Sequence, residues 1–369
     1  MKSNGIKWPG IKILDRYIIG KFLGTYVMAL LFIIVVVVVF DIAEKMDDFI
    51  ELKAPAKEIA FGYYLNFIPF FVNQFSGLIT FIVLIFFTSR MAYNTEIVAM
   101  LSGGVSFKRF LWPYFLASCV ITAFSITLNL FVIPQANERR IEFETHFLKK
   151  GRRVKFEEHI YRQIEPGTFA YIRDYRSGDK SASFLVLETY DGSAIQNSLE
   201  ASQVKFNAET KRWSAPRYIT KKYVDGKEYM EKHEKLDTMI NLTSDELGKV
   251  DNLVKTMGFK RLNSFIQQQR NKGSDMVRQF EVERYTRVAY PMSTFVLTLI
   301  GVAISSRKVR GGTGLHIGMG LGLCFSYILF IRFAEEFAKG GVMTPLLAVW
   351  FPNIIYAVVA IYLYKKAPK

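Results

Sequence analysis

The stretch FLGTYVMALLFIIVVVVVF at residues 22–40 contains no Asp, Glu, Lys or Arg. About 20 apolar residues in a helix cross a hydrocarbon core roughly 30 Å thick, so this stretch predicts a transmembrane helix. Five further stretches lack charged side chains and are 19 to 31 residues long, namely 59–89, 110–137, 288–306, 311–331 and 340–364. The sequence therefore predicts six transmembrane helices rather than a large soluble protein with buried core helices.

The first apolar stretch is expected to remain in the protein. It is longer than the usual apolar core of a signal peptide. The residues that follow it are FDIAEKMDD (40–48), which offer no small-residue cleavage site. We therefore interpret it as a retained transmembrane helix.

Loop charges predict the orientation of the six helices. The two chain ends and the loops at 90–109 and 307–310 together hold 14 Lys and Arg residues, whereas the loops at 41–58 and 332–339 hold five. Loops rich in Lys and Arg stay in the cytoplasm. We expect both termini to face the cytoplasm and the long segment 138–287 to face the other side of the membrane.

The net charge of +15 also bears on the partners of the chain. Part of it follows from the charge bias of the loops, and part lies in segment 138–287, which holds 29 basic and 23 acidic residues. For a basic domain outside the cytoplasm, an anionic lipid headgroup or glycolipid is favoured over nucleic acid as a partner.

The long segment begins with a region typical of β-strands. Its runs alternate or are rich in β-branched and aromatic residues, and turn sequences such as RSGD (176–179) and YDGS (190–193) separate them. Short strands at regular spacing predict a sandwich, a jelly roll or an open barrel. The predicted runs are 169–175, 183–190, 202–207, 215–224 and 227–242.

A helical connector is predicted after the strands. In residues 259–270 the apolar side chains recur at helical spacing, and Ser274 or Asp275 can cap a following helix that leads into the fourth span. The expected organisation is three spans in 1–137, a β domain on the side opposite the cytoplasm in 138–258, the connector in 259–287 and three spans in 288–369.

No enzyme motif is present in the sequence. The chain contains no GxxxxGK[ST], HExxH, GxSxG or CxxC pattern, and its two cysteines, Cys119 and Cys324, lie in predicted spans. A membrane enzyme would need a nucleophile or a metal site near the interface of the membrane, and no such site is visible in the sequence. An ion-coupled transporter usually carries ionisable residues within its spans, and these six spans carry no Asp, Glu, Lys or Arg.

A short amphipathic stretch, NTEIVAMLSGGVSFKRF (94–110), separates the second and third spans. Ile97, Met100 and Leu101 fall on one side of a predicted helix, Glu96 suits its N-terminus and Gly103 ends it. One interpretation is an ordinary interfacial helix joining two spans. The other is a docking element for a soluble partner, such as an ATPase that supplies the energy this chain cannot.

Polar and small residues within the spans predict internal contacts. Polar side chains in apolar spans usually face the bundle interior, and we expect this of Asn66, Asn73, Gln74 and Asn129. We also expect Pro69 to break the second apolar run. Glycines four residues apart permit close helix packing, so positions 314, 318 and 322 predict a helix-contact face.

Three motifs, taken in order, carry a family resemblance. They are LDRYIIGKFLGT (14–25), EIVAMLSGGVSFKRF (96–110) and AYPMSTF (289–295), set among three spans, a β domain and three further spans. The chain resembles the LptF/LptG family of lipopolysaccharide-export permeases over nearly its whole length. Its LDRY opening is closer to the G-type half.

The resemblance implies a role and a set of partners. The chain would be a permease subunit that passes lipopolysaccharide from the inner membrane to a periplasmic β-jelly-roll bridge. Its partners would be an LptB-like cytoplasmic ABC ATPase dimer that binds ATP and Mg²⁺, a second LptF/LptG-type permease and an LptC-like single-span accessory protein. The chain itself would bind no cofactor or metal, and its own β domain would be a β-jelly roll.

The resemblance also implies site residues. The helix at about 94–103 would be the coupling helix that enters a groove of the ATPase. Glu96 matches the acidic residue of the family there, and the residues implied in this contact are Glu96, Ile97, Met100, Leu101 and Gly103.

The glycolipid phosphates have no clear contact at the end of the first span. Family members often place lysines there, but this chain has only Lys45 among acids. The expected substitutes are Arg332 or the clusters formed by Arg139 and Arg140 and by KKGRRVK (149–155). For Arg332 an ion pair with Glu335 or Glu336 is the alternative. Alternative functions for the whole chain are a mechanotransmission-type ABC permease and a membrane-anchored lipid-binding protein without transport.

Overall fold

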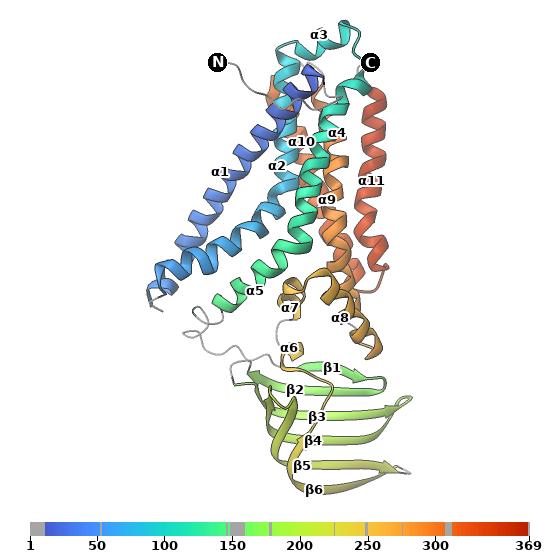
Figure 1. The fold of residues 1–369 in the computed structure, drawn as a ribbon. Coiled ribbons are helices and arrows are strands. Elements are labelled where there is room, and N and C mark those ends of the chain that lie inside the picture. The colour runs from blue at the N-terminus through green and yellow to red at the C-terminus, as the bar shows by residue number, and fades with distance from the viewer. Residues whose placement is uncertain are drawn as a thin grey trace. The chain divides into compact units, whose positions relative to one another are not determined.

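The structure combines long helices with one β-sheet (Figure 1). This computed structural model describes residues 12–51, 54–144, 147, 159–176, 179–224, 226–247, 250–274, 276–306 and 312–367. Within these residues six helices are long and apolar enough to cross a membrane, and the sheet lies in sequence between the third and the fourth. The predicted fold class, a helical membrane protein with an inserted all-β domain, is confirmed.

The chain divides into two units, which are described separately here. The first takes its described residues from 1–45, 67–133 and 285–369, and the second from 46–66 and 134–284. The long helices that lie wholly or mostly in the first unit are α1 (Ile13–Glu51), α2 (Leu65–Tyr93), α4 (Phe107–Thr127), α9 (Val277–Ser305), α10 (Gly312–Lys339) and α11 (Pro345–Lys366), with a short helix α3 (Glu96–Ser102) between α2 and α4.

Two apolar clusters hold the first unit together. One draws mainly on α1, α2, α3 and α4, and the other joins α2 to α9, α10 and α11. Helix α2 contributes buried residues to both clusters, among them Leu84 in the first and Phe81 in the second. The helices that precede the inserted domain in sequence and those that follow it therefore both pack against α2.

Helix α1 extends further than the sequence indicated. The segment 41–58 was expected to be a loop, but α1 continues to Glu51 and spans 39 residues, or about 58 Å. Lys45 pairs with Asp41 one turn earlier, with Nζ 2.6 Å from Oδ1. Pairs of opposite charge at this spacing stabilise a helix, which is why the charged sequence continues it.

The predicted break at Pro69 is wrong. The π-helical turn η1 (Glu58–Tyr64) and α2 form one candidate span of 36 residues that runs through Pro69. Pro69 removes the donor to the Leu65 carbonyl, and membrane helices tolerate such a loss where neighbouring groups compensate for it. In the wide turn that precedes this position, Asn66 Nδ2 donates to the backbone oxygens of Phe61 (3.0 Å) and Gly62 (2.9 Å).

The glycines that permit close packing differ from those predicted. A Cβ placed on Gly314, Gly318 or Gly322 would meet nothing within 4 Å in the described chain. By contrast, a Cβ on Gly320 would lie 2.0 Å from Ile85 Cδ1, and one on Gly301 would lie 2.4 Å from Leu84 Cδ2. The face of α10 that packs on α2 is therefore the one carrying Gly320.

The β domain in the second unit is one antiparallel sheet whose strands follow in sequence order (Figure 1). The predicted runs are confirmed as strands, although the last ends at Thr238 rather than at 242. β1 and the first half of β4 lie inside the region 160–242 that was expected to be β but were not identified as separate runs. The strands are β1 (Ile160–Glu165), β2 (Thr168–Arg176), β3 (Ser181–Asp191), β4 (Ala194–Asn207), β5 (Arg212–Val224) and β6 (Lys227–Thr238).

An irregular row crosses these strands and bends the sheet. Asp174, Gln203 and Lys235 have positive φ angles of 53°, 54° and 63°. Core-facing side chains normally recur every second residue, but they step by three across this row. The pairing register is the same on both sides of the row, so neighbouring strands change their buried face together and the described strands form one bent sheet. The steps are Ile172 to Tyr175, Ala182 to Leu185, Ala201 to Val204 and Ala215 to Tyr218.

Helices flank the sheet in sequence within the second unit. They are α5 (Ile133–Phe143, after the π-helical turn Leu128–Val132), α6 (Ser244–Leu247), α7 (Val250–Thr256) and α8 (Phe259–Asn271). The predicted helix at 259–270 is confirmed as α8. Leu262, Phe265 and Ile266 are buried as expected, but Phe259 is 40% exposed. Helices α6 and α7 lie inside the range assigned to the β domain.

Candidate functional site: helix α3 and its neighbours

Helix α3 is a separate element set between two spans, and local sequence fixes both of its ends. Thr95 precedes it with a φ of 58°, and Gly103 and Gly104 follow it, the latter with a φ of 87°. Gly104 suits this conformation because it has no Cβ. Ser106 Oγ then accepts a hydrogen bond from the backbone N–H of Arg109 (3.3 Å), so Ser106 caps α4.

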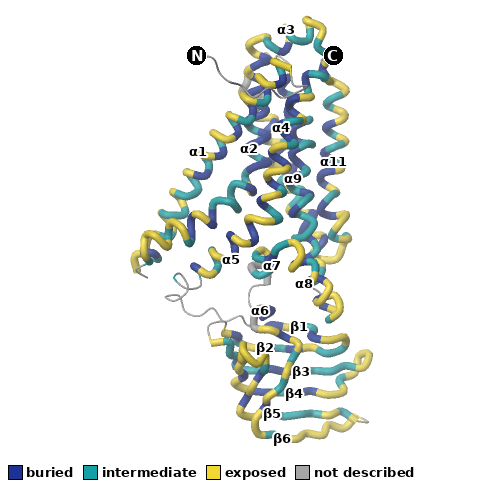
Figure 2. Tube along the Cα trace, in the orientation of Figure 1, coloured by how far each residue is buried: buried dark blue, intermediate teal, exposed yellow. Residues whose placement is uncertain are grey.

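The inner side of α3 packs on the bundle. Ile97 is 1% exposed within the first apolar cluster, and Met100 and Leu101 pack against that cluster while half-buried. These residues were expected to contact a partner, but Ile97 anchors the helix to its own chain. The outward side instead carries Val98, which is 52% exposed, and Ala99, as Figure 2 shows by the exposed segments of α3.

Glu96 lies at the start of α3 and contacts helix α1. Tyr17 Oη donates to Glu96 Oε2 and Asn94 Nδ2 donates to Oε1, each over 3.3 Å. Both donors are neutral groups, and both distances are at the long end of the hydrogen-bond range. The carboxylate is therefore positioned at the edge of the helix but only weakly held.

A buried ion pair, not predicted from the sequence, lies beside this contact. Both guanidinium nitrogens of Arg109 donate to the Asp15 carboxylate over 2.6 Å, and the Lys12 backbone N–H adds a third bond of 2.9 Å. Asp15 is fully buried. Bidentate pairs of this kind are strong and directional, so the first turn of α1 is fixed to the first turn of α4. The available signal was that Asp15 is the single acid before the first span.

The candidate phosphate contacts are divided between the two units, and most have partners within the chain. In the first unit, Lys45 pairs with Asp41, and Arg332 pairs with Glu335 over 3.1 Å. In the second, Arg140 Nε lies 3.6 Å from Glu144 Oε1, and Arg139 is exposed on α5. The expected ion pair between Arg332 and Glu335 is therefore present, and the candidate cluster at 149–155 lies outside the described residues.

Polar side chains inside the bundle form hydrogen bonds, as expected for spans. Asn73 Nδ2 donates to Asn129 Oδ1 over 3.0 Å, and Ser125 also donates to Asn73. Asn66 is buried as well, whereas Gln74 is exposed, so the prediction is wrong for Gln74. Such bonds satisfy polar groups that hydrocarbon could not.

Together, six spans, an inserted β domain and a short helix packed between two spans define a multi-pass membrane protein. The sequence model described as "Lipopolysaccharide export system permease LptF/LptG" matches residues 16–366. The chain therefore belongs to the LptF/LptG family. A search of the curated proteins found no match.

Family membership fixes the coarse function. The chain is a multi-pass inner-membrane protein and a permease of the lipopolysaccharide export system. It is a transport subunit rather than an enzyme, and it belongs to a complex that contains an ABC ATPase and other Lpt proteins.

Proposed function

We propose that this chain is the G-type permease subunit of an ATP-driven exporter that extracts lipopolysaccharide from the inner membrane and passes it to a periplasmic β-jelly-roll bridge. The observation that carries the proposal is helix α3. One side of α3 is anchored in the bundle, and its other side presents Val98 beside the weakly held carboxylate of Glu96. A helix with these two sides suits a groove on a soluble partner.

The partner at α3 is a cytoplasmic ABC ATPase dimer that binds ATP and Mg²⁺. The cytoplasmic contact comprises Glu96, Met100, Leu101 and the turn at Gly103, with Ile97 holding the helix in place. Ala367, beside the chain's end, belongs to the same apolar cluster as Ile97. This supports an orientation with both termini on the ATPase side and the β domain in the periplasm.

A second LptF/LptG-type permease contacts the outer faces of α1 and α10. In these helices only 11% and 22% of the most apolar window are buried within the chain, against 61% in α9 (Figure 2). Gly314, Gly318 and Gly322 leave a smooth strip along α10. Lipopolysaccharide enters beside these two helices, and an LptC-like single-span protein joins the complex there.

The phosphates of the glycolipid contact basic groups of this chain. Arg139 is exposed, while Lys45, Arg140 and Arg332 must exchange a carboxylate partner for a phosphate. The exchange costs least at Arg332, whose side chain is 66% exposed, because surface ion pairs contribute only about 0–1 kcal/mol. Reversing the charge of Arg139 and Arg140 together should reduce the glycolipid that copurifies with the complex, and unchanged glycolipid would remove these two residues from the proposal.

The test is native mass spectrometry of the complex purified gently from its own membranes. The wild type should carry an ATPase, a second permease and lipopolysaccharide, and Glu96→Ala should lose the ATPase. Tyr17→Phe is the matched control, since it removes the internal bond to Glu96 and keeps the carboxylate. If Tyr17→Phe loses the ATPase to the same extent as Glu96→Ala, then Glu96 affects ATPase binding only through its contact with α1 and not through a direct contact with the ATPase.

Other outcomes would support the alternatives. A wild type that carries an ATPase but never lipopolysaccharide would favour a mechanotransmission-type permease. A wild type that runs alone with bound glycolipid would favour a lipid-binding protein without transport.

A further inference from the structure

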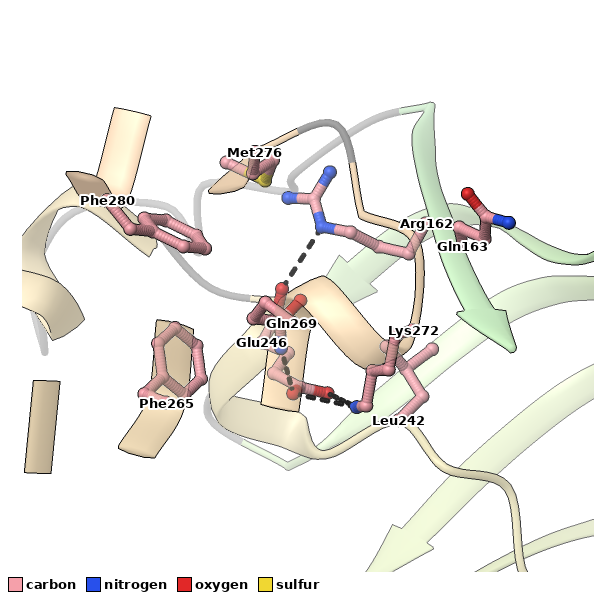
Figure 3. Close-up of a pocket in the computed structure, with 9 residues that line it drawn as sticks. All are labelled: Arg162, Gln163, Leu242, Glu246, Phe265, Gln269, Lys272, Met276 and Phe280. Atoms are coloured by element: carbon pink, nitrogen blue, oxygen red, sulfur yellow. Dashed lines mark hydrogen bonds and ion pairs between the residues drawn. The ribbon is translucent and has the colours of Figure 1, made fainter. Parts of the chain in front are cut away.

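The second unit contains two separate apolar clusters. One is the core of the β-sheet and includes Trp213 and Leu242, and the other joins α7, α8 and the start of α9 through Leu262 and Phe280. A small cavity between these groups is lined by polar side chains as well as by apolar ones (Figure 3). We call the polar residues Arg162, Glu246, Gln269 and Lys272 the Glu246 joint.

The Glu246 joint is centred on a buried carboxylate. Lys272 Nζ donates to both Glu246 oxygens, at 2.9 and 3.2 Å, and Gln269 Nε2 donates to Oε1 at 2.7 Å. The side chains of Glu246 and Lys272 are each 12% exposed. Arg162 Nε donates to the backbone oxygen of Glu246 over 3.3 Å, as Figure 3 shows. The joint therefore ties β1 and α6 to the last turn of α8.

Backbone contacts restrict the joint further. The backbone N–H of Thr243 donates to Glu246 Oε2 over 3.1 Å, and Lys272 Nζ also donates to the backbone oxygen of Asn241 over 2.8 Å. Gly273 follows with a φ of 77°, and a Cβ there would lie 2.9 Å from Gln163 Nε2. These contacts together hold the end of α8 in one position against β1, the edge strand of the sheet.

A joint of this kind resists sliding. Apolar surfaces can shift past one another at little cost because the hydrophobic effect is non-directional. A buried carboxylate with several donors is different, because displacing one partner leaves an uncompensated charge. The polar contacts therefore set the register between the sheet and α8, while the apolar clusters supply cohesion on each side.

We infer that Glu246 is a positioning residue of the exporter, which holds the β domain and α8 in one register so that they move as a single body during transport. The inference rests on the proposed export function for its role in transport. It does not need that function for the geometry, so the two can be tested apart.

The first experiment measures geometry. Spin labels at Ser202 on β4 and Ser264 on α8, both exposed positions, report the distance between sheet and helix in the assembled complex, with Cys119 and Cys324 replaced by serine. Glu246→Leu combined with Lys272→Met removes the pair, and apolar replacements of a buried pair usually preserve stability. We expect a similar thermal midpoint and a broadened distance distribution.

The second experiment measures coupling in proteoliposomes containing the whole exporter. The double variant should transfer about five-fold less lipopolysaccharide per ATP hydrolysed, a coupling change of ordinary size. Glu281→Gln is the matched control, because Glu281 is similarly buried and pairs with Arg270 between α8 and α9 rather than across the joint. The control should keep both the sharp distance and the wild-type transfer ratio.

The outcomes separate the two proposals. An unchanged distance distribution in the double variant would overturn the Glu246 inference whatever happens to transport, and so would a broadened distribution with the wild-type transfer ratio. If the wild-type exporter transfers no lipopolysaccharide while the double variant broadens the distance, the export function fails and the geometric part of the inference stands.

Discussion

Gly320 offers a sharp test of the packing between α10 and α2. In Gly320→Ala the new Cβ would lie 2.0 Å from Ile85 Cδ1 and 3.6 Å from Phe81 Cε1. Ile85 and Phe81 are 2% and 0% exposed, so the Ile85 methyl group must rotate within a packed interior to make room. Overpacking of this kind costs about 1–3 kcal/mol. The Gly→Ala change returns about 0.5–1 kcal/mol through backbone entropy, and we expect a net loss of up to about 2.5 kcal/mol.

Gly318→Ala is the matched control on the same helix. A Cβ there meets nothing within 4 Å, so only the favourable backbone effect remains. Thermal midpoints of the purified chain in one detergent provide the assay. At roughly 2–4 °C per kcal/mol, Gly320→Ala should lower the midpoint by several degrees while Gly318→Ala leaves it unchanged or raises it. Equal shifts in the two variants would refute the packing of α10 on α2 through Gly320.

Three further predictions concern single contacts. Arg109→Met should cost about 2–4 kcal/mol because it strands the buried Asp15 carboxylate, and adding Asp15→Asn should recover part of the loss in a double-mutant cycle of midpoints. Gln203→Gly should stabilise the chain by up to about 1 kcal/mol because its φ is positive, whereas Ser202→Gly in the regular strand beside it should destabilise it by a similar amount, again read from midpoints. Ser106→Ala should cost about 1 kcal/mol by removing the cap of α4, and faster amide exchange in the first turn of α4 would report it.

The six spans could be predicted because composition alone determines them. A run of 19 or more uncharged residues has few soluble alternatives, and the sequence contains six such runs. The ends of the helices were less predictable. At residues 41–51 the change from apolar to charged sequence marks the end of an apolar surface, and not the end of α1. Local pairs such as Asp41 with Lys45 continue the helix where hydropathy suggests a loop.

Which face of a helix packs was harder to predict than where the helix lies. Glycine spacing pointed to 314, 318 and 322, because a period of four is the recognisable pattern. The structure packs Gly320 and Gly301 on α2 instead, which depends on the bulk of Leu84 and Ile85 on the opposing helix. Likewise the position of α3 was predicted, but the burial of Ile97 depends on distant residues such as Phe107.

The Glu246 joint could not be predicted for a related reason. Its residues, Arg162, Glu246, Gln269 and Lys272, are of types that normally lie on surfaces, and the chain brings them together over more than a hundred positions. The bend of the sheet was hidden in the same way. Strict alternation of buried and exposed side chains predicts strands without a bend. A step of three in one strand looks like a local irregularity, and its meaning becomes clear only when Asp174, Gln203 and Lys235 are seen in one row.

Two carboxylates at the α3 end of the helical unit, Asp15 and Glu96, show how geometry separates a structural acid from one available to a partner. Asp15 is fully buried and already accepts two bonds of 2.6 Å from the Arg109 guanidinium. Within the part of the chain that the structure describes, Glu96 accepts hydrogen bonds only from the neutral groups of Tyr17 and Asn94, both at 3.3 Å. Charge-assisted bonds are roughly twice as strong as neutral ones. A basic group of a docked protein can therefore displace Tyr17 from Glu96 with a net gain, whereas displacing Arg109 from Asp15 would gain nothing.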